Sequence, residues 1–144
     1  MLRKIALGLS VLVLALFIAS IAGYVITGPQ APAADSVSAQ WLKPGPYMTA
    51  SSDKVFVDSS RGTAANRDYS GAADRTLATT LWYPLDSEES HPLVIHSHGF
   101  TSARNDLSYV AELLASHGYI VAAADYPLTH GGAPGKPNAV DVVN

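Results

Sequence analysis

Two short apolar runs, separated by an amphipathic segment, constrain the fold more than any other feature of this sequence. Leu93–Ile95 follows a proline and Tyr119–Ala124 follows a glycine, and both runs are continuous, as is typical of strands buried on both faces. Between them, apolar residues recur at helical spacing at Leu107, Val110, Leu113 and Leu114. Strand, helix and strand with short connections predict a right-handed βαβ unit, and therefore an α/β fold with an at least partly parallel sheet.

The carboxyl ends of these strands are where a ligand is expected, because sheets of this kind bind ligands outside those ends. Residues His98–Thr101 follow the first strand, and residues Tyr126–Gly135 follow the second. Upstream, the composition predicts strands at Lys54–Val57 and Thr76–Tyr83, with a polar loop at Arg61–Asp74 between them.

An uncharged segment, Ile5–Ile26, follows Arg3 and Lys4 at the N-terminus. At about 1.5 Å per residue it reaches roughly 33 Å, enough to cross a hydrocarbon layer of about 30 Å. The two cations predict a cytoplasmic N-terminus and a remainder that is exported to the cell envelope or secreted. Residues 1–26 are therefore expected to be a membrane anchor or a signal peptide, and their length favours the anchor.

The rest of the chain has the composition of one folded domain. Residues 27–40, with Gly28, two prolines and four alanines, predict a flexible linker, and residues 41–144 are too few for more than one domain. The 144 residues include 9 basic and 12 acidic ones and no cysteine. No basic run follows Thr27, so nucleic acid is not an expected partner, and thiol catalysis and Cys-ligated zinc are excluded.

The sequence resembles the first βαβ unit of α/β-hydrolases. The resemblance rests on Pro92–Phe100 (PLVIHSHGF), on Leu114–Ala123 (LASHGYIVAA) and on Asp125, and the good match covers Leu77–Pro127. It is most similar to plasma-type platelet-activating factor acetylhydrolases and to dienelactone-hydrolase-like and polyester-hydrolase-like bacterial enzymes. This implies the N-terminal part of an α/β-hydrolase fold with a mostly parallel sheet. It also implies a serine hydrolase of carboxylic esters, such as lipid acyl esters or polyesters, that needs no cofactor.

The resemblance also implies roles for three consecutive residues. In ester hydrolysis the carbonyl oxygen gains negative charge, and two preorganised backbone N–H groups stabilise it. One donor follows the nucleophile, and the other lies in the loop between the strand and the first helix. By position, this second donor is the N–H of Phe100. Gly99, Phe100 and Thr101 are the implied substrate-binding residues, with Tyr126–Gly135 at the pocket rim.

The catalytic triad that the resemblance implies is missing from the sequence. Hydrolases of this fold carry the nucleophile in Gly-x-Ser-x-Gly, followed by an acid and a histidine. The segment Ile95–Gly99 has isoleucine where that turn needs a small residue, so Ser97 is not expected to be the nucleophile. His130-Gly131-Gly132 imitates an oxyanion motif but follows the wrong strand, and we interpret it as loop. The triad is expected downstream of Asn144, and the chain by itself is expected to be inactive.

Two alternatives from other functional classes stay open at this point. His96 and His98 share one face of a strand, as zinc ligands of metal-dependent hydrolases do, although the residues that follow supply no further ligand. No metal is expected if the serine hydrolase is correct. Asp125 is interpreted as a turn or cap residue rather than a catalytic one. The third possibility is a non-catalytic fragment tethered to the membrane.

Overall fold

The computed structural model describes residues 2–139, and the side chains of residues 8–139. The side chains of Arg3 and Lys4, and residues 140–144 at the end of the predicted hydrolase domain, lie outside the described part. The chain divides into two compact units, Met1–Trp41 and Leu42–Asn144.

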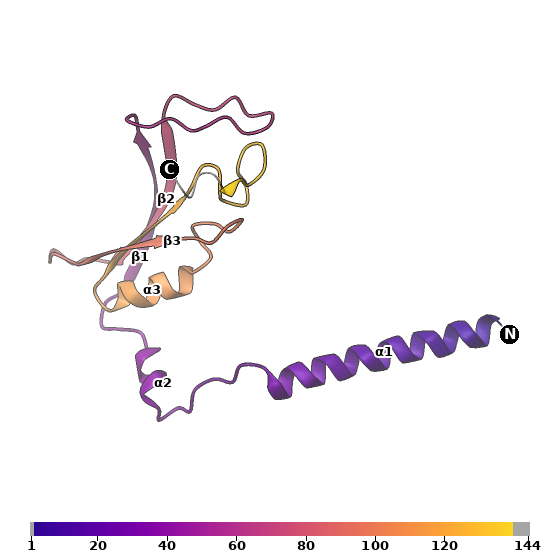
Figure 1. The fold of residues 1–144 in the computed structure, drawn as a ribbon. Coiled ribbons are helices and arrows are strands. Elements are labelled where there is room, and N and C mark those ends of the chain that lie inside the picture. Colours follow the sequence, from indigo (N-terminus) through magenta and orange to yellow (C-terminus); the bar gives the residue numbers. More distant parts are fainter. Residues whose placement is uncertain (1, 140–144) are drawn as a thin grey trace. The chain divides into compact units, whose positions relative to one another are not determined.

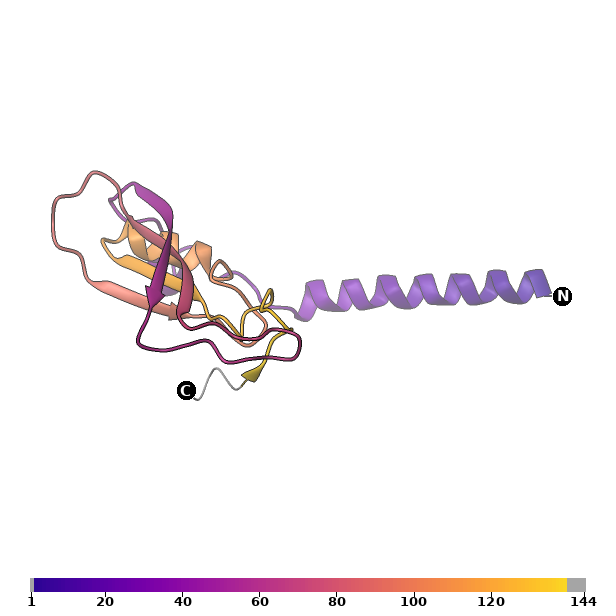
Figure 2. The same cartoon turned by 90° about the horizontal axis from the view of Figure 1, so that it is seen from above.

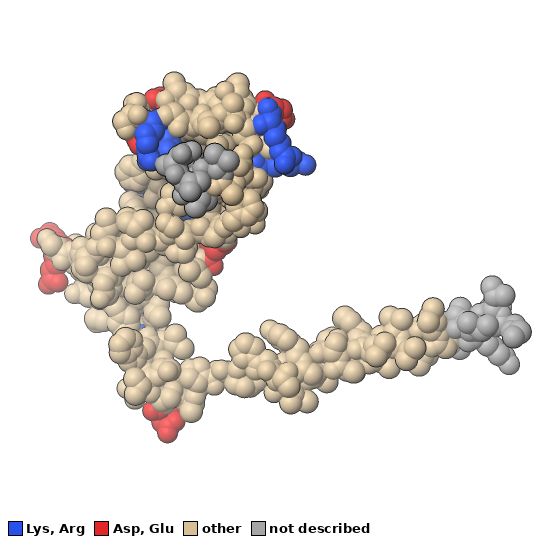
Figure 3. Space-filling view, in the orientation of Figure 1, with Lys and Arg blue, Asp and Glu red and all other residues tan. Residues whose placement is uncertain are grey.

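The first unit consists of two helices. Helix α1 (Leu2–Thr27) contains the segment Gly8–Thr27, which has a mean hydropathy of 2.6 and no buried residue. Figure 3 shows no charged side chain along its described part. By length and composition α1 can cross a membrane, a description that fits a retained anchor and a signal sequence equally.

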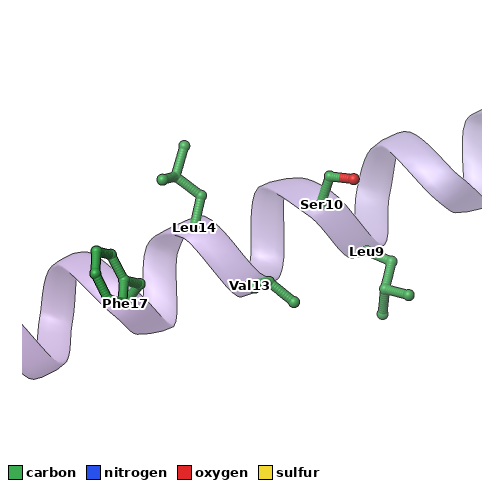
Figure 4. A pocket seen from close by; sticks show the side chains of 5 residues that line it. All are labelled: Leu9, Ser10, Val13, Leu14 and Phe17. Atoms are coloured by element: carbon green, nitrogen blue, oxygen red, sulfur yellow. The ribbon is translucent and has the colours of Figure 1, made fainter.

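Two further features of this unit are a shallow hollow beside α1 and a short second helix. The side chains that line a hollow beside α1, which are Leu9, Ser10, Val13, Leu14 and Phe17, project from a single helix and enclose no cavity (Figure 4). Helix α2 (Val37–Trp41) overlaps the end of the predicted flexible linker. The Ser36 hydroxyl caps it by accepting a hydrogen bond from the Ala39 N–H at 3.1 Å, which explains how so short a helix forms.

The second unit is a four-stranded sheet in the order β1-β2-β4-β3 (Figure 1). Its strands are β1 (Thr49–Asp58), β2 (Arg75–Pro84), β3 (Leu93–Ser97) and β4 (Ile120–Asp125). Strands β3 and β4 pair in parallel, as the βαβ pattern predicts, with helix α3 (Ser108–Ser116) between them in the chain. The pairs β1–β2 and β2–β4 are antiparallel, so the described part of the sheet is mixed. The α/β class is confirmed, and the parallel arrangement is confined here to the pair joined by a helix.

Helix α3 packs on one face of this sheet in both views (Figures 1 and 2). The core beneath it is a cluster of five buried side chains: Trp82, Ala111, Ala115, Val121 and Ala123. The alanines let the helix approach the strands closely, and Ala115 is fully buried. The helix ends at Ser116, and Gly118, the stop residue that the sequence predicts, follows its cap with a φ of +90° and an N–H that donates to the carbonyl of Ala115 at 3.0 Å.

The opposite face of the sheet is open, which corrects one expectation. Leu93 and Ile95 were expected to be buried on a strand covered on both faces, yet they are 61% and 63% exposed. Strand β3 is an edge strand, and within residues 42–139 the single helix, α3, packs on the other face of the sheet. Phe56, which the pairing registers place on the same open face, is 50% exposed. Together these side chains form an apolar surface that the described residues of this unit leave uncovered.

Candidate active site

The carboxyl ends of β3 and β4 bring two loops together, residues 98–107 and residues 126–138. The loop between β1 and β2, residues 59–74, lies at the same edge because β2 runs antiparallel to β4 (Figure 1). Buried Asn66 joins it to the loop after β4, since its Nδ2 donates to the carbonyl of Pro134 at 2.9 Å and that of Lys136 at 2.7 Å. The end of the sheet where the sequence predicts ligand binding is therefore built from three loops that are joined by hydrogen bonds.

The loop after β3 is fixed to the loop after β4 by backbone hydrogen bonds. The N–H of Thr101 donates to the carbonyl of Thr129 at 2.9 Å, and the N–H of Gly131 donates to the carbonyl of Ser102 at 2.8 Å. Such paired bonds leave this part of the loop little freedom. Its backbone groups therefore hold fixed directions before any ligand binds.

His98 fixes the beginning of the same loop through both ring nitrogens. The N–H of Tyr126 donates to His98 Nε2 at 3.2 Å, so Nε2 is the acceptor and Nδ1 carries the proton. Nδ1 then donates to the carbonyl of Gly99 at 2.8 Å. The ring also lies 5.3 Å from the ring of Tyr126, centroid to centroid. His98 is thus a buried structural link between the two loops.

Among the described residues, the N–H of Phe100 has no hydrogen-bond partner. The Gly99 carbonyl accepts from His98 and also from the Ser102 N–H at 3.0 Å. Because the C=O and N–H of a trans peptide point in opposite directions, the Phe100 N–H is turned away from these donors. It makes no hydrogen bond to any other described residue, and Phe100 is 55% exposed. A Cβ added at Gly99 would meet nothing within 4 Å, so the space beside Gly99 is open.

Thr101 has a strained backbone beside this donor. Its φ of +65° lies in the left-handed region, which a β-branched residue rarely adopts. A Cβ added at Gly131 would come within 2.7 Å of the Thr101 carbonyl oxygen, so the two loops approach closely here. Strain of this kind persists where the surroundings fix the chain, and it concentrates at functional sites.

The other residues singled out in the sequence have different surroundings. Ser97 Oγ lies 2.7 Å from the hydroxyl of Tyr126 and has no histidine partner. His130 Nδ1 accepts from the Gly132 N–H at 3.2 Å, within a loop. His96 Nε2 is buried without a partner. Within the described residues, no three His, Cys, Asp or Glu side chains lie close enough to hold a metal ion.

Sequence reasoning did not single out Arg104, which binds Asp125. The backbone N–H of Arg104 donates to Asp125 Oδ1 at 2.7 Å, and its guanidinium forms an ion pair with Oδ2. Asp125 thus joins two loop ends across the sheet rather than capping α3, whose N-cap residue Leu107 has no side-chain cap. The sequence offers one indication of this pair: a single basic residue, Arg104, lies in the loop after β3, and an acidic residue, Asp125, lies at the end of the neighbouring strand β4.

Comparisons with known proteins agree with the resemblance seen in the sequence. Residues 29–127 match the family described as platelet-activating factor acetylhydrolase, isoform II. The platelet-activating factor acetylhydrolase of Cavia porcellus is 46% identical over 43 residues, which are 30% of this chain and 10% of that protein.

Two solved esterase structures are also similar. A ferulic acid esterase from Streptomyces cinnamoneus has a TM-score of 0.48 and 25% identity, over 62% of this chain and 37% of that one. An acetyl xylan esterase from a Thermoanaerobacterium species has a TM-score of 0.33 and 22% identity, over 56% and 26%. The chain thus spans well under half the length of these relatives. Because the family match extends over more than half of the chain, this protein belongs to the platelet-activating factor acetylhydrolase, isoform II, family.

Proposed function

We propose that this chain forms the oxyanion-binding side of a serine hydrolase that acts on carboxylic esters. The N–H of Phe100 carries the proposal, because it has no partner among the described residues and belongs to an exposed residue in a loop held by backbone hydrogen bonds. Family membership supports the same activity. When a nucleophile attacks an ester, this N–H donates to the carbonyl oxygen as negative charge develops there.

The neighbouring residues supply the substrate site in this proposal. Gly99 lacks a side chain where the substrate carbonyl approaches, and the exposed ring of Phe100 borders the acyl group. Thr101 and the loop Tyr126–Gly135 form the rim. The substrate class is a lipid acyl ester or a polyester-like ester, and the chemistry needs no cofactor.

The nucleophile is proposed to lie outside this chain, in a Gly-x-Ser-x-Gly turn of the full-length protein, followed by an acid and a histidine. Ser97 is a poor candidate because its hydroxyl is paired with Tyr126 and no base contacts it. Zinc ligation by His96 and His98 is disfavoured because both ring nitrogens of His98 already have protein partners. A non-catalytic tethered fragment is the remaining alternative.

The test is ester hydrolysis by the full-length protein that contains this sequence. We expect turnover of p-nitrophenyl acetate, unchanged within about twofold by Ser97→Ala and by a chelator, and abolished by an organophosphate that modifies serine. Residues 1–144 alone are expected to give no turnover. Activity lost on chelation and restored by Zn²⁺ would favour the metal alternative. No turnover of any ester by the full-length protein would favour the non-catalytic alternative.

We also propose that α1 is a retained anchor, with the Leu42–Asn144 unit on the exported side. The described part of the helix has no polar face with which it could pack in a soluble protein. The product is expected to stay in the membrane fraction after washing with alkaline carbonate. Protease added from outside the cytoplasm is expected to digest the second unit. A soluble product that lacks residues 1–26 would instead establish a cleaved signal.

A further inference from the structure

A partly buried ion pair holds the loop that carries Phe100. The guanidinium of Arg104 pairs with Asp125 through Nη1, and its Nε donates to the hydroxyl of Thr80 at 3.0 Å. The backbone N–H of Arg104 donates to the other oxygen of the same carboxylate. The two charged side chains are only 23% and 13% exposed, so water screens their attraction weakly.

The same cluster extends across the sheet to β1, the edge strand on the opposite side from β3. The Thr80 hydroxyl donates to Asp53 Oδ1 at 2.6 Å, and Arg104 Nη2 lies 3.8 Å from Asp53 Oδ2. Arg104 therefore links its loop to three strands at once: β1, β2 and β4. Asp53 is 69% exposed, so Asp125 is the stronger electrostatic partner of the guanidinium.

Two consecutive residues at the end of β4 hold the loop at two points. Tyr126 holds His98 through its backbone N–H, and Asp125 holds Arg104 through its carboxylate. Phe100 lies between these two points in the chain, and the bonds of Thr101 and Ser102 to the loop after β4 lie between Phe100 and Arg104. The attachments on both sides of Phe100 therefore restrict the loop that carries its N–H.

We propose that Arg104 and Asp125 are positioning residues that keep the Phe100 N–H aimed at the substrate oxygen, an inference that rests on the proposed function. Stability alone is a weak reason for such a pair, because apolar residues of similar volume often stabilise a protein as well as a buried ion pair does. An apolar pair, however, would not fix the orientation of the loop. The planar guanidinium and the carboxylate fix distance and orientation together.

The test uses Arg104→Lys and Arg104→Ala in the full-length protein. Lysine keeps the charge but cannot reproduce the forked contact to Asp125 and Thr80. Because a shift of about 1 Å can cost about 100-fold in rate, we expect kcat for p-nitrophenyl acetate to fall about tenfold in Arg104→Lys. In Arg104→Ala we expect about 100-fold, with KM within about twofold in both variants. Rates are expressed per active site titrated with an organophosphate, so that unfolded molecules are not counted.

A second measurement monitors the Phe100 N–H itself. The amide signal of Phe100 in ¹⁵N-resolved NMR spectra should move in both variants. It should stay in place in the matched control Arg61→Ala, which removes an exposed arginine paired with Asp58 at 2.8 Å. Wild-type kcat together with an unmoved Phe100 signal in folded Arg104→Ala would overturn the inference. If the wild-type protein hydrolyses no ester, the proposed function fails, and an unmoved signal would then still overturn the positioning role.

Discussion

Replacing Phe100 by proline in the full-length protein is expected to lower kcat for ester hydrolysis by about 10²–10³-fold, or about 2.7–4 kcal/mol of transition-state stabilisation. Proline removes the backbone N–H together with the ring, and the fold loses no hydrogen bond at this position, because this N–H has no partner among the described residues. Phe100 is also absent from the described residues with positive φ, so its φ has the negative sign that proline requires. The measurement is kcat and KM for p-nitrophenyl acetate, with thermal unfolding followed in parallel.

The matched control is Phe100→Ala, which keeps the N–H and removes the ring. We expect KM to rise severalfold in this variant because the ring borders the acyl group, whereas kcat stays within about threefold. A folded Phe100→Pro protein with wild-type kcat would mean that the charge on the substrate oxygen is stabilised elsewhere. An equal loss of kcat in both variants would mean that the ring, rather than the N–H, is what matters.

The part of the fold that the sequence predicts best is the part whose side chains follow a burial period. Strand β3, helix α3 and strand β4 lie within one or two residues of the predicted ranges. Strand β1 was expected only at Lys54–Val57 and begins five residues earlier, at Thr49. The added segment is polar, and it is a strand because its backbone pairs with β2 from Pro84 to Thr80. Backbone pairing leaves little trace in side-chain composition.

The burial of β3 shows a second limit of pattern reasoning. A continuous apolar run indicates that both faces of a strand are covered, but it does not say which residues cover them. Val94 packs on the core beneath α3, whereas its neighbours Leu93 and Ile95 face the open side. The apolar run is typical of a strand covered on both faces, whereas residues 42–139 cover only one face of the sheet.

The candidate site also has a part that could be predicted from the sequence and a part that could not. Gly99, Phe100 and Thr101 could be named from the sequence, because their place after a strand and their resemblance to a family are both local properties. The link between Arg104 and Asp125 could not, because the partners are 21 residues apart and meet only when β3 and β4 pair. The direction of the Phe100 N–H likewise depends on bonds to residues beyond position 125.

The unit Leu42–Asn144, expressed without α1, is expected to aggregate and to unfold without a cooperative transition. Leu93 and Ile95 are more than 60% exposed on a sheet face that the described residues leave uncovered. Strand β3 is also the sheet edge, so its outer backbone groups can pair with another molecule. We expect size-exclusion chromatography to show oligomers, and circular dichroism to show a broad melt.

Two variants on the same strand separate the open face from the core. Leu93→Thr with Ile95→Thr should reduce aggregation severalfold at little cost to folding, because these side chains add little to the packed core. Val94→Thr, which points to the other face and packs on the Trp82 cluster, should destabilise the unit by about 1–3 kcal/mol and increase aggregation. A monomeric wild-type unit with a sharp transition would show that the sheet needs no further cover. Ester turnover by that unit, lost in Ser97→Ala, would show in addition that Ser97 is the nucleophile after all.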